Sequence, residues 1–470
     1  MQSIIRLALL AATTALAGCA SFSPDGGMSA VADLAGRTTG QEIVSVRSDD
    51  DATRVRAATQ RLLARPLSAD AAVQVALFNN KGLQAAYHQL ALSEADAIGA
   101  SLPPNPTFSL MRLSGDGALE AERQVAGDIL ALATLPLRSE IARQRFHQAQ
   151  LMAALATVRL AAEVRRAHVR VVAANELVAL LAEAQSAAEA TAKLAQKLGE
   201  TGALNRLDQA REQVFYAETT AELAGARRAA ASARERLIRL MGLWGDDLRF
   251  RLPDRLPALP RRPLTEPFVE RDAVAHRIDL QMARLELSAL ATSLQLSDAT
   301  RFVTLLDLAG LDRKTVEPDG RIIRERGYDV QFQIPIFDGG EVRVRQAAET
   351  YNIAFNRLTE RAVTIRSEAR DAYRSYRATF EIAGHYAREV LPLRQIISEE
   401  MQLRYSSMQV DIFALLVEAR QRLASRRAAI DAKRDFFLAE AELSAAVNGG
   451  GAGREDVPQQ TASALASSND

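Results

Sequence analysis

The sequence predicts a mainly α protein with a small β portion, in which long antiparallel helical hairpins are the largest elements. Three observations support this fold class. Four long stretches carry apolar residues at helical spacing and contain almost no proline. The order of elements occurs twice along the chain, and each half contains segments with the alternation of a β-strand.

The four helical stretches are longer than a compact core requires. They cover residues 138–198, 203–241, 340–405 and 411–447, and only the third contains an internal proline, Pro392. A helix of about 60 residues spans roughly 90 Å. The few residues around Gly202 would join the first two stretches into a hairpin. Such a pattern also suits a coiled-coil spacer, but the duplication and the strands argue against that alternative.

The duplication rests on three matches that occur in the same order in both halves. Residues 83–86 match 280–283, residues 135–137 match 334–336, and residues 202–207 match 408–413, at offsets of 197, 199 and 206. Because the offsets are nearly constant, we interpret the halves as an internal repeat. Five prolines in the segment 253–267 exclude a continuous helix between the halves.

The strand segments differ in clarity. From Tyr328 to Ile334, apolar side chains alternate strictly with Asp329, Gln331 and Gln333. This pattern suits the wall of a membrane barrel and equally a half-buried soluble strand. Residues 302–311 and the turn 318–320 would complete this second strand pair. In the first half, residues 107–110 alternate briefly, 128–135 are expected to be strand, and 119–125 also suit a helix.

The only cysteine, Cys19, stands at the end of a secretory signal. Arg6 precedes an apolar run, and Leu16-Ala17-Gly18-Cys19 resembles a bacterial lipobox. The resemblance implies cleavage before Cys19 and acylation of its thiol. Ala20 follows, where the aspartate that retains lipoproteins at the inner membrane is absent, so the outer membrane is implied. The alternative is an ordinary buried cysteine beside a signal peptide.

We therefore divide the chain into six parts: a lipoprotein signal peptide (1–18), a lipid-anchored extended segment (19–65), a first repeat of one helix, two strands and two long helices (66–252), a proline-rich linker (253–267), a second repeat (268–447) and a disordered tail (448–470). The later apolar segments, such as residues 169–182, are interrupted by charges and are not expected to span a membrane as helices. Only a closed barrel could then cross it.

Residues 66–447 resemble the TolC-type outer membrane factors. The most specific marks are Ile-Pro-Ile-Phe-Asp-Gly-Gly at 334–340, Leu-Pro-Pro-Asn-Pro at 102–106, and Gly202 with Asn205 and Leu207. At the first mark, Pro335 and Asp338 lead to Gly339 and Gly340, which permit backbone angles closed to other residues where a strand bends into a helix. A phosphate loop could also hold a glycine pair, but the required spacing is absent.

The resemblance implies a homotrimer anchored in the outer membrane and extending into the periplasm. Each chain would give four strands to a twelve-stranded β-barrel and its helical hairpins to a periplasmic α-barrel. The protein would be the passive exit duct of a tripartite efflux or type I secretion system, working with an inner-membrane pump. A periplasmic adaptor would dock at the hairpin tips, which contain Gly202, Leu204, Asn205, Met408, Val410 and Asp411.

Two positions depart from the family pattern. Met408 replaces the glycine of the second tip, so the two tips need not bind an adaptor equally. The acidic pair that often rings the closed aperture in the family matches Ala414 and Val417 here. Asp208 or Asp411 would have to supply an acidic gate; otherwise the aperture is apolar.

Other classes of function find little support. Acidic and basic residues balance at 58 each, so no net charge favours nucleic acid. The five histidines are scattered, and we expect no metal site, no cofactor and no catalysis. The main alternative is a lipid-anchored periplasmic adaptor or scaffold with coiled-coil hairpins and no pore. An adaptor normally has one hairpin between β-rich domains, whereas two hairpins and few strands are expected here.

Overall fold

The computed structural model describes residues 22–449, which belong to two compact units. The sheet unit contains the chain up to Ala30, Tyr87–Met152 and Asp279–Arg361. The hairpin unit contains Val31–Ala86, Ala153–Ile278 and the chain from Ala362 onward. Each unit therefore draws on both sequence repeats, which fold together rather than as separate domains.

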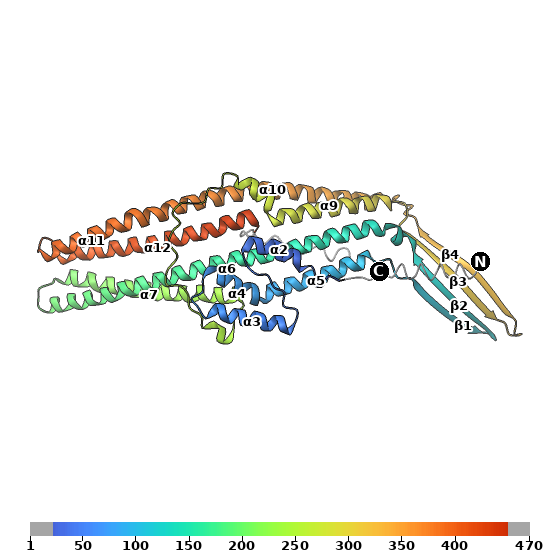
Figure 1. Cartoon of the computed structure of the whole chain (residues 1–470), viewed down its shortest axis with the longest axis horizontal. Coiled ribbons are helices and arrows are strands. Elements are labelled where there is room, and N and C mark those ends of the chain that lie inside the picture. The colour runs from blue at the N-terminus through green and yellow to red at the C-terminus, as the bar shows by residue number, and fades with distance from the viewer. Residues whose placement is uncertain (1–21, 450–470) are drawn as a thin grey trace. The chain divides into compact units, whose positions relative to one another are not determined.

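The sheet unit is built around four antiparallel strands in the order β1-β2-β3-β4 (Figure 1). They are β1 (Thr107–Gly115), β2 (Ala118–Asp128), β3 (Leu305–Val316) and β4 (Ile322–Gln333). Asp116 and Gly117 both have positive φ in the tight turn between β1 and β2, as the twist of a two-residue hairpin requires. Pairing of β2 with β3 joins the two repeats, and both predicted strand pairs are present.

Helices flank the strand pairs in each repeat. Helix α5 (Lys81–Ser101) precedes β1, and α9 (Ile278–Ala299) precedes β3. Helix α6 (Ile129–Glu200) follows β2, and α10 (Glu341–His385) follows β4. The first parts of α6 and α10 belong to the sheet unit and their later parts to the hairpin unit.

The expected strand at residues 128–135 is wrong. The second strand is β2, which covers the segment that also suited a helix, and α6 begins at Ile129 rather than near residue 138. The Asp128 carboxylate accepts a hydrogen bond from the Ala131 amide (2.7 Å) and so caps the new helix. The Leu- and Ala-rich residues after it are strong helix formers, and this preference outweighs their alternation.

The third long stretch is helical as predicted, but it contains a π-helical turn that the sequence did not predict. Helix α10 ends at His385, a single π-helical turn covers Tyr386–Val390, and α11 covers Leu391–Ser406. Pro392 lies in the first turn of α11. Because proline has no amide hydrogen, it suits a first turn and breaks the hydrogen-bond pattern of a helix interior. The hairpin unit is completed by α7 (Arg206–Met241) and α12 (Ile412–Asn448).

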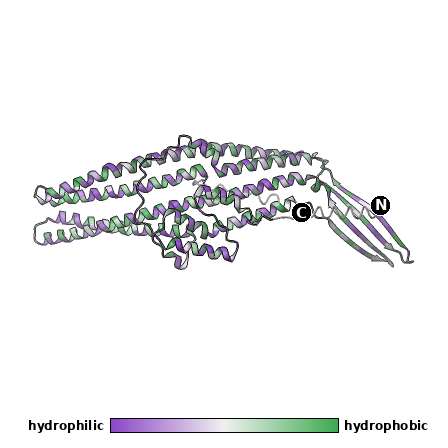
Figure 2. Cartoon of the chain, in the orientation of Figure 1, coloured by the Kyte–Doolittle hydropathy of each residue, from purple (hydrophilic) through white to green (hydrophobic). Residues whose placement is uncertain are grey.

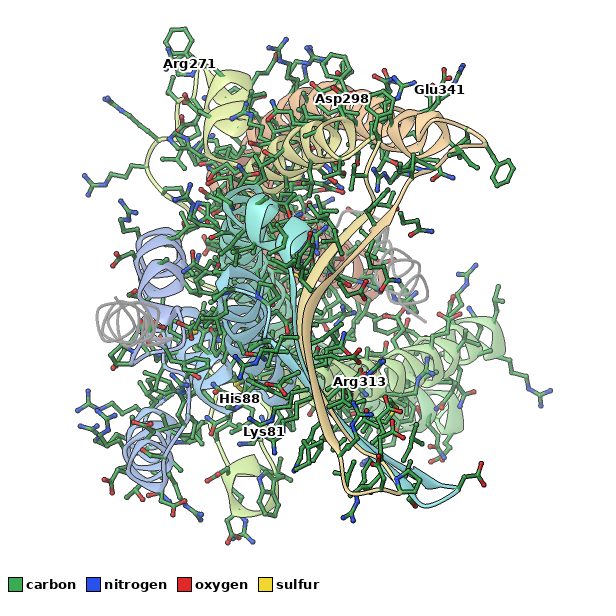
Figure 3. The ribbon with its side chains drawn as sticks, turned by 90° about the vertical axis from the view of Figure 1, so that its right-hand side faces the viewer. Lys81, His88, Arg271, Asp298, Arg313 and Glu341 are labelled. Carbon is green, nitrogen blue, oxygen red and sulfur yellow. The ribbon has the colours of Figure 1, made fainter. Side chains whose placement is uncertain are left out.

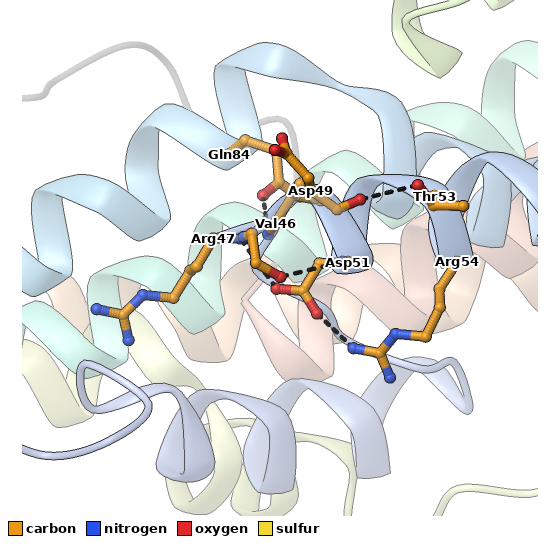
Figure 4. Close-up of polar contacts among 8 residues, drawn as sticks. Val46, Arg47, Asp49, Asp51, Thr53, Arg54 and Gln84 are labelled. Carbon is orange, nitrogen blue, oxygen red and sulfur yellow. Dashed lines mark hydrogen bonds and ion pairs between the residues drawn. The ribbon is translucent and has the colours of Figure 1, made fainter.

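The segment 19–65 is not extended as predicted, because its described part contains α2 (Met28–Thr39) and α3 (Asp49–Leu63). Figure 4 shows polar contacts around Asp51 at the start of α3. There the Ser48 hydroxyl accepts from the Asp51 amide (3.1 Å), and the Asp51 carboxylate accepts from the Ser48 amide (3.2 Å). This capping box satisfies amides that a free helix end leaves open. Val46 donates its amide to Gln84 (2.9 Å), which ties the segment to α5.

Shorter elements surround the hairpins. They are α4 (Ala69–Asn79), a 3-10 turn (Gly245–Leu248) and α8 (Val269–His276), while the linker 253–267 contains no helix, as predicted. Tyr376 of α10 and Phe436 of α12 are fully buried, with ring centroids 5.5 Å apart. Their contact anchors the second hairpin.

By length and composition alone, one helix in the described part of the chain could cross a membrane. An 18-residue window of α6 has a mean hydropathy of 1.2, and 33% of it is buried. The sequence prediction excluded such segments because charged residues interrupt them, whereas this window contains at most two charged residues. Core helices of soluble proteins pass the same criterion, so the window alone does not place α6 in a membrane.

Candidate functional sites: the sheet and the hairpin tips

The pairing register divides the sheet into an apolar and a polar face, and the alternation is visible along the strands in Figure 2. The apolar face holds Phe108, Leu110, Val125, Leu308, Tyr328, Val330 and Phe332. The opposite face, which we call the polar face, holds Ser109, Gln124, Asp307, Asp329, Gln331 and Gln333, together with the apolar Met111, Leu113, Leu305, Leu311 and Ile323. Tyr328 is 80% exposed and Phe332 59%, so nothing in the described chain covers the apolar face of β4.

The polar face carries an ion-pair cluster near the hairpin turns. Arg313 of β3, labelled in Figure 3, donates to Glu122 (2.6 Å) and forms an ion pair with Glu120 (2.9 Å), both on β2. Its guanidinium also lies 4.0 Å from Glu325 of β4. The only cation of this face is therefore paired on both sides, and the cluster holds three neighbouring strands in register.

The turn from β4 into α10 depends on two glycines. Gly339 and Gly340 both have positive φ (57° and 74°), as the sequence predicted. A Cβ on Gly340 would lie 2.1 Å from the Arg301 carbonyl oxygen, whereas Gly339 has open space around it. The Asp338 side chain accepts from the Gly340 amide (3.0 Å), and the Gly339 amide donates to the Pro335 carbonyl (2.8 Å). All four predicted turn residues therefore lie together.

The first repeat makes the same transition without such a turn. Its β2 ends at Asp128 and α6 starts at the next residue, so Pro136, which matches Pro335, lies inside the helix. The segments 135–137 and 334–336 are thus equivalent in sequence but not in structure.

The two hairpin tips have the same backbone construction. At the first, the Gly202 amide donates to Gly199 (3.1 Å) and the Ala203 amide to Leu198 (2.8 Å). At the second, the Met408 amide donates to Tyr405 (3.0 Å) and the Gln409 amide to Arg404 (2.8 Å). These paired bonds are the Schellman motif, which places a residue of positive φ after the helix. Gly202 has φ 73° and Met408 has φ 58°.

The helix after each tip begins with a side-chain cap. Asn205 accepts from the Asp208 amide (2.9 Å), and Asp411 accepts from the Ala414 amide (2.8 Å). Of the aperture candidates, Asp411 is thus used as a cap, and Asp208 forms an ion pair with Arg211 of its own helix (3.0 Å).

The remaining candidates lie at the tips or in the first turns of the helix that follows the second tip. Ala414 lies in the first turn of α12, and Val417 is half-exposed one turn further on. Leu204 of the first tip lines the same small cavity as Ile412 and Phe413 beyond the second, whereas Val410 does not line it. Met408 is 94% exposed. Cys19 lies outside the described residues.

Sequence reasoning missed two buried ion pairs near the tips. Glu212 of α7, only 4% exposed, accepts from Arg420 of α12 (3.0 Å), and Arg420 also lies over the Phe215 ring (4.2 Å). Glu418 of α12 accepts from Arg394 of α11 (3.0 Å). The first pair connects the two hairpins and the second connects the helices of one hairpin. In the sequence, only a glutamate at a helix position that the apolar pattern places on the buried face could have indicated such a pair.

Comparisons of the whole fold give consistent results. A membrane protein from Pseudomonas aeruginosa aligns with a TM-score of 0.68 and 20% identity, covering 83% of this chain and 93% of that one. The outer-membrane channel OprN aligns with a TM-score of 0.68 and 18% identity, covering 87% and 94%. The outer membrane protein VceC from Vibrio cholerae aligns with 0.67 and 16%, covering 81% and 96%. The chain has the fold of these outer-membrane proteins.

This fold is the one that the resemblance to TolC-type outer membrane factors implied. The predicted class, mainly α with two long hairpins and four strands in one chain, is confirmed. No family model matches the sequence, and no curated protein matches it significantly.

Proposed function

We propose that this protein is the outer-membrane channel of a tripartite export system, a passive duct across the periplasm and the outer membrane. The observation that carries the proposal is the four-stranded sheet with one exposed apolar face and one polar face. Lipid on one side and water on the other require that division. The fold shared with the channel OprN supports the same function. A lipid-anchored scaffold without a pore would have no use for this sheet.

Three copies would complete the channel. Within residues 22–449, β1 and β4 each have one neighbouring strand, so both are open edges. Four strands cannot close a barrel around a lumen, whereas twelve can. An open edge at membrane depth would leave backbone groups unpaired in lipid. Pairing of β1 with β4 of the next copy removes both edges.

The channel reading is tested by single-channel recording in planar lipid bilayers. Purified protein in mild detergent should migrate as a trimer and produce discrete conductance steps. A monodisperse monomer that is soluble without detergent and gives no conductance would exclude the channel and favour the scaffold.

The tips would receive a periplasmic adaptor, with an inner-membrane pump supplying the energy. Gly202, Leu204 and Asn205 form one contact surface, and Met408, Val410 and Asp411 form the other. The matched Schellman turns support two related docking surfaces, and the exposed Met408 side chain makes the second different. We further propose that the aperture is apolar around Ala414 and Val417, because Asp411 is used as a cap and Asp208 is paired with Arg211.

Substitution at the tips tests the adaptor contact. Gly202→Arg should leave the trimer intact and stop export, because the new side chain fills the docking surface, while Met408→Gly should have a mild effect. Site-specific cross-linking in cells measures both. Normal cross-linking and export by Gly202→Arg, with failure of Met408 variants, would reverse the assigned roles.

Lipid anchoring would occur through Cys19, the only cysteine of the chain. Cys19→Ala should abolish palmitate labelling of the mature protein, and persistent labelling would refute this assignment. A barrel could reach the membrane without the acyl groups, so export need not be lost.

A further inference from the structure

On β2, β3 and β4 the continuous apolar rows of the apolar face end at the same row, whereas β1 continues with Leu110 before Arg112. Phe108, Val125, Gly310 and Tyr328 lie side by side across the sheet in that row. The next row toward the hairpin turns contains Arg123, Asp312 and Arg326, beside Leu110 of β1. The row after that contains Arg112, Lys314 and Arg324, beside Ala121 of β2. Five cations and one carboxylate therefore follow the apolar rows on the same face. The row nearest the hairpin turns is apolar again, with Leu119, Val316 and Ile322 beside Ser114.

Four of these cations have no partner in the described part of the chain. Arg326 is paired with Asp312 (3.2 Å). Within residues 22–449, the side chains of Arg112, Arg123, Lys314 and Arg324 form no hydrogen bond or ion pair, and we call these four the outer cationic band. The polar face at the same level is the opposite, since its cation Arg313 is surrounded by Glu120, Glu122 and Glu325.

The height of the band in a membrane follows from its position. A cation that faces hydrocarbon destabilises a barrel strongly at the midplane and little at the interface. Cations directly beyond the apolar rows therefore lie at headgroup level. There, phosphate groups form charge-assisted hydrogen bonds with guanidinium and ammonium groups, and each nearby cation adds to the attraction of an anionic surface.

We propose that the outer cationic band binds phosphate-bearing headgroups of anionic membrane lipids. The inference rests on the proposed function, because it requires the apolar face to meet lipid. Charge complementarity identifies the occupant, because the unpaired positive charge of these strands lies on the face that would meet lipid. Arg112 and Arg123 lie next to Leu110, which acyl chains would cover. Lys314 and Arg324 lie in the row of Arg112, one row further toward the turns than Leu110. A trimer would carry the band around the whole barrel.

The test compares a band variant with a variant of the opposite face. Lys314→Gln/Arg324→Gln removes two band cations, and Arg313→Gln removes the paired cation of the polar face. Binding of lipid A, a glycolipid with two phosphates, is measured for the intact protein in mild detergent by native mass spectrometry. Loss of two cations should weaken binding about 30-fold. Arg313→Gln should change it less than about twofold, because that side chain faces away from lipid.

Three outcomes would overturn the inference. They are equal lipid A binding by the wild type and the band variant, an equal loss in Arg313→Gln, or complete displacement of lipid A by inorganic pyrophosphate, which would make the site one for free phosphates. Bilayer recording of the same samples separates this failure from failure of the proposed function. If the wild type conducts normally and the band variant binds lipid A as the wild type does, only the lipid-binding role of the band is refuted. If the wild type shows no conductance, the channel itself is refuted.

Discussion

The two sequence repeats form the same two features, a strand-to-helix transition and a hairpin tip, with different residues. The second repeat passes from β4 into α10 through Gly339 and Gly340, whereas the first passes from β2 into α6 without a glycine turn. At the tips the order is reversed, because glycine occupies the position of positive φ in the first repeat and Met408 occupies it in the second. Duplication has conserved the backbone path at the tips and not the residue that suits it best.

The largest effect is expected at the glycine turn. Gly340→Ala combines a positive φ with a Cβ 2.1 Å from a backbone oxygen, and should cost about 3 kcal/mol of folding free energy. Gly339→Ala is the matched control, with a positive φ and open space, and should cost about 1 kcal/mol. Thermal melting followed by circular dichroism measures both. Equal melting temperatures for the two variants would show that the close approach to Arg301 is not decisive.

The next effect concerns the ion pair that joins the hairpins of the two repeats. Glu212→Gln should destabilise the protein by about 2 kcal/mol, because Arg420 then loses its buried charged partner. Glu222→Gln removes the exposed pair with Arg427 between the same two helices, and should cost less than about 0.5 kcal/mol. Denaturant titration of each variant gives the comparison. Similar losses for Glu212 and Glu222 would mean that burial adds nothing to this contact.

Substitutions at the two tips should change the stability of the protein in opposite directions. Met408→Gly should stabilise the protein by up to about 1 kcal/mol, since glycine adopts positive φ without steric cost. Gly202→Ala should destabilise it by about 1 kcal/mol for the same reason. If calorimetry gave the same sign for both variants, the proposed equivalence of the two turns would be wrong.

The smallest effect is a pH dependence that arises from a buried histidine of the first repeat. Leu67 in the first repeat accepts at its carbonyl from the His168 imidazole (2.8 Å). Burial lowers the pKa of His168 below its ordinary value of 6.5, although the hydrogen bond to Leu67 opposes the shift.

The unfolded chain therefore binds a proton more readily than the folded one, and stability should fall as the pH decreases below about 6.5. Melting temperatures at pH 7.5 and 5.5 should differ more in the wild type than in His168→Gln. An unchanged difference in that variant would assign the pH dependence to other groups.

Local patterns in the sequence predicted those features that depend on neighbouring residues. The hairpins followed from helical periodicity, and the turn at Gly340 followed from its glycine pair. The match of Gly202 with Met408 was also correct, and the structure explains it through identical hydrogen bonds.

Other features depend on contacts between distant segments. Strand β2 is a strand because β1 and β3 pair with it on both sides, although its own residues also suit a helix. The ion pair of Glu212 with Arg420 depends on how α7 and α12, from different repeats, are oriented about their own axes. The apolar pattern of each helix alone does not specify this orientation. Helix α3 was missed because it lies in a polar segment with weak periodicity. The capping box of Ser48 and Asp51 is a local helix signal that the prediction did not use.

The central claim is that the four strands are one third of a closed barrel, and cysteine pairs across the open edges test it most directly. Cysteine replaces Ser109 on β1 together with Asp329, Gln331 or Gln333 in turn on β4, in a Cys19→Ala background. Oxidation of the membrane-embedded protein should give one pair that forms a covalent ladder of monomer, dimer and trimer that stops at three chains. A ladder that ends at the dimer or continues beyond the trimer, or a disulfide within single chains only, would contradict the trimeric barrel.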